Sequence, residues 1–291
     1  MSDTSPVRLG FDDGIARIIL DQPGSRANVL STSMWSALAS AVAEIAAHTE
    51  LDGVLISSAK DGIFLAGADL KELAALPVDD EVPARQVVKN GLQVLEALEA
   101  LTIPTAAVID GACLGGGFEV ALACDYRLAG KHPKLKLGLP EVKLGLIPGW
   151  GGTQRLTRVI GVRRGVELLM SGKALAGNEA LEQGLVDRIV DSDQLVSEGM
   201  QILHAAPTED WEARRAAKQS PSQANFNFNE SRSLLNALND DERPAGEAVL
   251  RVLEAGMSKP LSPAIECETN EFVKLLLGAA SRRRIAAFLQ K

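Results

Sequence analysis

Three short apolar runs, each followed by a glycine turn and a helical pattern, most constrain the fold of this chain. The runs are GVLIS at 53–57, TAAVID at 105–110 and DYRLAG at 125–130. Continuous aliphatic runs of this length are typical of strands buried on both faces of a parallel sheet. Because these strands alternate with helical segments, the sequence predicts an α/β fold.

The segments around these runs carry further structural signals. Residues 7–21 alternate in polarity around an Asp-Asp-Gly sequence, which predicts a β-hairpin with a tight turn. Amphipathic spacing predicts helices over 32–48 and 81–101. A third helix is expected after Gly115, and a strand passes into a helix near Asp69.

The pattern changes along the second half of the chain. After residue 151 short helical segments follow one another, separated by glycines. Residues 206–230 are rich in Ser, Asn and Gln and predict an irregular connector, whereas 245–290 are again helical. We therefore expect an α/β core over 1–200 and a helical C-terminal region over 201–291. That region would cover the core or mediate assembly with another subunit.

Composition excludes several classes of protein. The chain is 46% hydrophobic and 23% charged, as in soluble globular proteins, and its net charge of −8 argues against a nucleic-acid surface. Three Cys without a CxxC pair and three scattered His make a disulfide framework or a metal site improbable. Neither a signal peptide nor an apolar span of membrane length is visible. We expect a soluble, cytoplasmic protein without a metal.

Two glycine-containing turns are candidate anion sites. Gly115-Gly116-Gly117 precedes a helix and leaves its first N–H groups uncovered, so it suits a phosphate, a carboxylate or a developing oxyanion. The alternative is a tight turn with close packing. The sequence is not GxGxxG and no Walker lysine follows. Ala66, Gly67 and Ala68 offer a second exposed amide before Asp69, which can cap the next helix. A plain strand–helix junction is the alternative there.

Two glutamates have unusual apolar surroundings. Glu119 precedes a run of Val, Ala and Leu, and Glu141 follows Pro140 between leucines. Removing a carboxylate from water is costly, so such groups are candidates for acid/base chemistry. Each also has a structural interpretation, because acidic residues favour the first turn of a helix and Pro-Glu is a common helix start. The sequence alone does not show whether the two meet.

Three ordered motifs resemble the enoyl-CoA hydratase (crotonase) family. They are FLAGADLKEL at 64–73, IDGACLGGGFEVALACDYRLA at 109–129 and GLPEVKLGLIPGWGGTQRL at 138–156. The segment SPAIECETNEFVKLLLGAASRRRIAAFL at 262–289 resembles the end of the hydratase domain in multifunctional fatty-acid oxidation α-subunits. There a dehydrogenase follows, but no GxGxxG occurs in this sequence, so we expect a stand-alone hydratase or an excised domain.

The resemblance implies a crotonase fold of stacked ββα units, assembled as trimers or dimers of trimers. It also implies a lyase that adds water, syn, to 2-trans-enoyl-CoA and gives 3-hydroxyacyl-CoA in fatty-acid β-oxidation. The backbone N–H groups of Ala68 and Gly116 would form the oxyanion hole. Glu119 would activate the water and Glu141 would protonate the α-carbon. Coenzyme A is then part of the substrate, and no other cofactor is expected.

Less specific matches to the family give candidate contacts for the rest of the substrate. Arg26 would contact CoA phosphates, with a solvated surface Arg as the alternative. The run Arg282–Arg284 would meet phosphates of a neighbouring subunit, or else it is a solvated helix end. Trp150 stands where the family often has a smaller residue or Phe and would reshape the acyl pocket. The remaining candidate substrate positions are Ala27, Ala66, Asp69, Leu70, Gly115, Pro140 and Gly149.

The same motifs are compatible with other functions. A Δ3-Δ2 enoyl-CoA isomerase needs only one acid/base group, so the presence of both Glu119 and Glu141 favours hydration. A non-catalytic acyl-CoA binder or an RNA-binding relative is the alternative from another class, and the acidic net charge argues against RNA. Dehydrogenase or thiolase partners of β-oxidation are further expectations of the resemblance.

Overall fold

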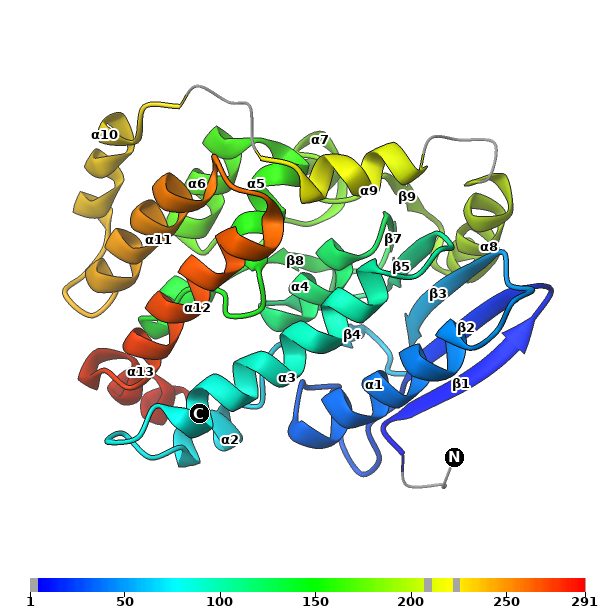
Figure 1. The fold of residues 1–291 in the computed structure, drawn as a ribbon, viewed down its shortest axis with the longest axis horizontal. Helices are drawn as coiled ribbons and strands as arrows, with labels where there is room; N and C mark the ends of the chain where they lie inside the picture. Colours follow the sequence, from blue (N-terminus) through cyan, green and yellow to red (C-terminus); the bar gives the residue numbers. More distant parts are fainter. Residues whose placement is uncertain (1–4, 207–210, 222–225, 291) are drawn as a thin grey trace.

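The computed structural model describes residues 5–206, 211–221 and 226–290, and it contains two sheets (Figure 1). In the larger sheet every neighbouring pair is parallel except β1 and β2. Its strands, in spatial order, are β1 (Val7–Asp12), β2 (Ile15–Leu20), β3 (Gly53–Ser58), β5 (Thr105–Ile109), β7 (Tyr126–Gly130) and β9 (Arg188–Val190). The smaller, parallel sheet contains β4 (Ile63–Leu65), β6 (Ala112–Leu114) and β8 (Lys136–Gly138).

A strand–strand–helix unit repeats through the core. In each unit a strand of the large sheet leads to a strand of the small sheet and then to a helix. The predicted crotonase-like stack of ββα units is confirmed. The helices of the first half are α1 (Thr32–Ala46), α2 (Leu70–Ala75), α3 (Val82–Glu99) and α4 (Gly116–Ala123), with the 3₁₀ helix η1 (Glu141–Leu144) after β8.

The first two strands form the predicted hairpin. Asp13 and Gly14 connect β1 to β2, with φ angles of 47° and 75°. Positive φ at both central residues is the requirement of a type I′ turn, whose twist matches the twist of the flanking strands. The Asp-Gly pair supplies it because both residues tolerate the left-handed region.

The central strands of the large sheet are buried on both faces. Every residue of β5 and β7 is buried. One face packs on α8 (Leu195–Ala205) through Leu55, Val108 and Leu203, and the other packs on the helices of the main core. This explains the continuous apolar runs, because neither face meets water. Residue 200, where we placed the boundary of the α/β core, falls inside α8.

The second half is helical, as expected. Besides β9 and α8, the described elements after η1 are α5 (Gly152–Ile160), α6 (Val162–Ser171), α7 (Gly177–Glu182), η2 (Ser192–Gln194), α9 (Trp211–Gln219), α10 (Phe228–Ser231), η4 (Arg232–Ala237), α11 (Arg243–Gly256), α12 (Leu261–Leu276) and α13 (Ala279–Leu289). The predicted irregular connector over 206–230 is wrong in part, because α9 and most of α10 lie within it. Its residues 207–210 and 222–225 lie outside the described ranges.

The sequence does not predict helix α9, because its buried contacts are made by charged groups rather than by an apolar stripe. Lys218 donates to the carbonyls of Leu122, Ala123 and Cys124 at the end of α4. Arg215 binds Asp125 on the same side. Long cationic side chains of this kind bury their stems and use only their heads for bonding.

The C-terminal helices cover the core of the same chain. Helix α12 packs on α3 and α5, and α13 packs on α2 and η1. In Figure 1 these red and orange helices lie beside the cyan α2 and α3. Within the described ranges, no helix is both long and apolar enough to span a bilayer.

Candidate active site

The turns after the strands of the small sheet meet at a cavity of about 1010 Å³. Helices α12 and α13 contribute Phe272 and Phe288 to its wall. The cavity brings together ten of the predicted site residues, from three separate segments: Ala66, Ala68, Asp69, Leu70, Gly115, Gly116, Glu119, Pro140, Glu141 and Gly149.

Two backbone N–H groups at this cavity have no acceptor among the described residues. Leu30 exchanges hydrogen bonds with Gly67 and Asp69, at 2.8 and 3.2 Å, so the Ala68 N–H between them is left unpaired. Gly116 begins α4, where no earlier turn supplies an acceptor. A Cβ atom placed on Gly67 would lie 3.9 Å from the Gly116 nitrogen, so the two turns approach closely. The pair suits an oxygen that carries negative charge.

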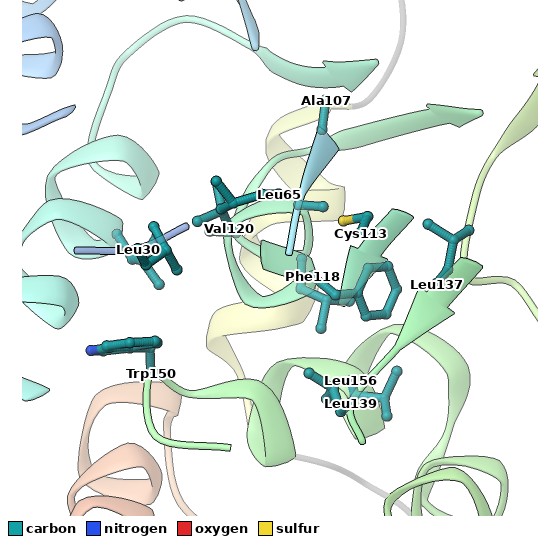
Figure 2. Packing of buried hydrophobic residues seen from close by; sticks show 14 of the residues in the cluster. Leu30, Leu65, Ala107, Cys113, Phe118, Val120, Leu137, Leu139, Trp150 and Leu156 are labelled. Atoms are coloured by element: carbon teal, nitrogen blue, oxygen red, sulfur yellow. The ribbon is translucent and has the colours of Figure 1, made fainter. Parts of the chain in front are cut away.

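The glycines before α4 also permit close packing. A Cβ on Gly117 would lie 2.2 Å from the Leu65 carbonyl oxygen, and one on Gly116 would lie 2.5 Å from Trp150 Cζ3. Figure 2 shows Leu65 and Trp150 around this helix start, with Phe118 directed toward Leu137. The glycine run therefore serves both as a closely packed turn and as a candidate anion site. Without side chains, the turn can pack closely and its N–H groups stay uncovered.

Glu119 lies in the first turn of α4 and is 1% exposed. Its Oε1 accepts the N–H groups of Trp150 and Gly152, both at 2.7 Å. Within the described part of the chain no group donates to Oε2, which leaves that oxygen for a ligand. Burial and the charges of Glu268 and Glu141 raise the pKa of Glu119, and its two backbone donors oppose that rise.

Glu141 opens η1 directly after Pro140. Its Oε2 is buried and accepts no hydrogen bond from the described residues. Burial raises the pKa of Glu141 to about 8. Burial raises the pKa of both carboxyls, and the two backbone donors of Glu119 favour its anion, whereas the Glu141 Oε2 has no donor among the described residues. The structure therefore places both glutamates at one cavity in unequal surroundings.

A third buried carboxyl, Glu268 on α12, was missed by the sequence analysis. It accepts the N–H groups of Gly151 and Thr153 at 2.6 and 2.9 Å, and also the Thr153 hydroxyl. Burial raises the pKa of Glu268 to about 7. A signal was present, because Glu268 falls on the apolar stripe of α12 between Ala264 and Phe272.

A buried ion pair stands behind this cluster and was also missed. The Arg155 guanidinium is bound to both oxygens of Glu99 at 2.8 and 2.6 Å, and it donates to the Trp150 carbonyl at 2.6 Å. Burial alone would lower the pKa of Arg155, but the Glu99 carboxylate raises it above its usual range. The fixed positive charge lies near Glu119 and Glu268 and stabilises the loop between them.

Trp150 forms one wall of the cavity. Its ring is 4% exposed and meets Trp35 edge to face, with centroids 5.1 Å apart. The indole nitrogen is buried, has no acceptor among the residues that the structure describes, and is directed away from Phe118 in Figure 2. A Cβ atom on Gly91 would lie 2.3 Å from that nitrogen, so the glycine within α3 makes room for the ring.

Two further groups of predicted residues are positioned differently, since only Arg283 and Arg284 among them line the cavity. Arg26 is exposed and neither it nor Ala27 lines the cavity, although the nearby Ser25 does. In the run at 282–284, Arg282 donates to the carbonyls at the end of α2, and Arg283 and Arg284 bind Asp241 of the same chain. Arg282 and Arg284 are half-buried and hold elements of this chain together, whereas Arg283 is exposed.

Comparison with known proteins assigns the chain to a family. A family model described as "Enoyl-CoA hydratase/isomerase" matches residues 10–234. The fatty acid oxidation complex subunit alpha of Shewanella loihica is 36% identical over 276 residues, covering 93% of this chain and 39% of the relative. The corresponding subunit of Shewanella halifaxensis is 35% identical over 283 residues, again covering 93% of this chain and 39% of the relative. The chain thus spans well under half the length of these relatives.

Solved structures agree with this assignment. An enoyl-CoA hydratase from Bacillus halodurans has a TM-score of 0.71 at 25% identity, covering 97% of this chain and 100% of that one. The human mitochondrial delta3-delta2-enoyl-CoA isomerase has a TM-score of 0.73 at 23% identity, covering 98% and 97%, and shares the fold. By motif, fold and similarity, this chain belongs to the enoyl-CoA hydratase/isomerase family.

Proposed function

We propose that the chain is an enoyl-CoA hydratase that adds water, syn, to 2-trans-enoyl-CoA and forms 3-hydroxyacyl-CoA in fatty-acid β-oxidation. The observation that carries the proposal is the pairing of Glu119 and Glu141, in unequal surroundings, with two unpaired N–H groups at one cavity. The names of the Bacillus halodurans hydratase and of the Shewanella oxidation subunits support it.

The geometry supports a sequence of proton movements in which every atom is accounted for. The Ala68 and Gly116 N–H groups bind the thioester oxygen and stabilise the charge that develops on it. Glu119 Oε2 accepts a proton from water as the water oxygen bonds to the β-carbon. Glu141 gives its proton to the α-carbon, and the electrons of the double bond form that new C–H bond. The proton on Glu119 then returns to Glu141 through water.

The mouth of the cavity suits the anionic part of coenzyme A. Lys71, Lys143, Arg283 and Arg284 line it, and the acidic side chains of Asp69 and Asp241 lie among them. We place the CoA phosphates there and the acyl group toward Trp150. Arg26 is a further candidate phosphate ligand. Coenzyme A enters as part of the substrate, and the mechanism uses no other cofactor.

The assembly proposed for this chain is a homotrimer or a dimer of trimers in the cytoplasm. Because the Shewanella relatives are named as subunits of a complex, dehydrogenase and thiolase partners belong to the same proposal. Light scattering of the purified protein tests the assembly, and a monomeric mass would contradict it.

Loss of the enoyl-thioester ultraviolet absorbance tests the activity. We expect rapid loss with the native protein, and loss slower by at least ~10²-fold in Glu119→Gln and in Glu141→Gln. The matched control is Glu44→Gln, which removes a carboxylate from the exposed face of α1 and should leave the rate unchanged. No loss with short, medium or long chains would contradict hydration. Turnover of a 3-enoyl-CoA would then indicate an isomerase, and binding without turnover an acyl-CoA binder.

A further inference from the structure

Four consecutive N–H groups of one loop alternate between two buried carboxylates. Glu119 accepts the first and third through Oε1, and Glu268 accepts the second and fourth. The donors, in order, are Trp150 at 2.7 Å, Gly151 at 2.6 Å, Gly152 at 2.7 Å and Thr153 at 2.9 Å. Each carboxylate thus holds every second amide of the turn that begins α5.

We propose that Glu268 is a positioning residue for the hydration proposed above, on which this inference rests. By binding Gly151 and Thr153, it fixes the turn that presents the two donors of Glu119. Gly151 has a φ of 90°, which glycine adopts without strain, and its N–H is bound by Glu268 from outside the loop. With Oε1 held in this way, Glu119 Oε2 is directed toward the substrate.

Glu268 itself does not reach the reacting atoms. Both of its oxygens are occupied, Oε1 by Gly151 and Oε2 by the amide and hydroxyl of Thr153. The side chain is fully buried and does not line the cavity, whereas Phe272, one turn later on α12, does. The role is therefore exerted through the loop and through charge.

The charge of Glu268 acts on both catalytic candidates. Its negative charge raises the pKa values of Glu119 and Glu141. From α5, Arg155 and Arg158 face the cluster with positive charge, and Arg155 is paired with Glu99 on α3. Ionised Glu268 consequently helps to keep the proton on Glu141.

Three variants separate the charge from the hydrogen bonds. Glu268→Gln removes the charge and one acceptor, whereas Glu268→Asp keeps the charge but shortens the reach. Glu271→Gln removes a carboxylate from the same helix, where it pairs with Arg251 instead of the loop, and serves as the control.

For Glu268→Gln we expect a fall in kcat of about 10²-fold with a nearly unchanged KM. We also expect the basic limb of the pH profile, set by Glu141, to move to lower pH by about half a unit. Glu268→Asp should lower kcat and leave that limb in place. A Glu268→Gln variant with native kcat, or with a lower kcat and an unmoved basic limb, overturns the proposal.

Amide hydrogen exchange gives a readout that does not need turnover. The peptide containing Trp150–Thr153 should exchange about tenfold faster in Glu268→Gln than in the native protein or in Glu271→Gln. Native exchange in that peptide overturns the positioning role even if the native protein proves inactive, so the two proposals fail separately. If Glu268→Gln does not fold, Thr153→Val removes the hydroxyl that donates to Glu268 and accepts from Gln154 Nε2, and it must show the same two changes to a smaller degree.

Discussion

At the scale of single residues, two identical side chains are made different by their donors. Glu119 receives two backbone N–H groups on one oxygen, whereas Glu141 leaves a buried oxygen without any. Donors to the anion favour ionisation, and burial without donors favours the neutral acid. The proposed hydration uses this difference, with Glu119 as the base and Glu141 as the acid.

This difference predicts the alkaline limit of activity. The pKa of Glu141 is raised to about 8, so the rate should fall as pH rises through about 8, because the proton donor is lost. The pH dependence of kcat/KM for a short enoyl-CoA measures it. Because the carboxylates interact, the measured values belong to the group rather than to single residues. A rate that continues to rise above pH 9 would contradict the assignment.

The same pKa shift makes a prediction about stability. A carboxyl whose pKa is raised by folding stabilises the protein fully below its unfolded pKa of about 4.3, and this contribution is lost as pH rises through about 8. Glu141→Gln cannot ionise, so its melting temperature should fall less than that of the native protein between pH 6 and pH 9. Thermal unfolding at both pH values tests this, and parallel falls in the two proteins would refute it.

Trp150 and Gly91 form a second residue-scale pair. Because a Cβ on Gly91 would lie 2.3 Å from the indole nitrogen, Gly91→Ala should displace the ring and cost about 1–3 kcal/mol of stability. Adding Trp150→Phe, whose smaller ring ends short of α3, should recover much of that loss. Urea unfolding of the single and double variants measures the coupling, and additive effects would mean that the two side chains do not share this space.

At the scale of elements, helix α4 is supported at both ends. Its first turn carries Gly116 and Glu119, and its last carbonyls accept three hydrogen bonds from Lys218 on α9, at 3.3, 2.9 and 2.7 Å. Burial lowers the pKa of Lys218 to about 8. The carbonyl end of a helix binds cations favourably, so α9 fixes the element on which the candidate catalytic groups stand.

Lys218→Met should therefore destabilise the protein by about 1–3 kcal/mol, because buried carbonyls lose their donor. Lys89→Met, on the exposed face of α3, is the control and should change stability little. Denaturant unfolding at neutral pH compares them. Equal stabilities of the two variants would show that water replaces the Lys218 head without cost.

Short elements mark the limit of what the sequence could predict. The hairpin, the central strands and α4 follow from local turn chemistry and apolar runs. By contrast, β6, β8 and β9 have three residues each, too few for any periodicity, and are defined by pairing with distant strands. The role of Glu268 could not be predicted for a related reason. Its partners, Gly151 and Thr153, are more than a hundred positions away.

At the scale of the whole molecule, cationic side chains gather at the cavity although the net charge of the chain is negative. The chain carries −8 overall, yet four cationic side chains line the cavity mouth. Attraction between exposed charges is screened by salt, with a Debye length of ~3 Å at 1 M. KM for an enoyl-CoA should therefore rise with ionic strength. A thioester of N-acetylcysteamine, which lacks the phosphates, should show no such rise, and equal salt dependence for both would place the phosphates elsewhere.

The loop held by Glu119 and Glu268 also has a consequence for folding. The large sheet adds its strands in chain order, and its paired residues lie at most 60 positions apart, as Leu128 and Arg188 do (188 − 128). The contact from Gly151 to Glu268 instead spans 117 positions and closes only when α12 docks. Contacts of such long range form at a high entropic cost. A chain emerging from the ribosome would therefore complete its large sheet well before Glu268 fixes the loop at 150–153. Catalytic turnover would then report that the last helices have docked.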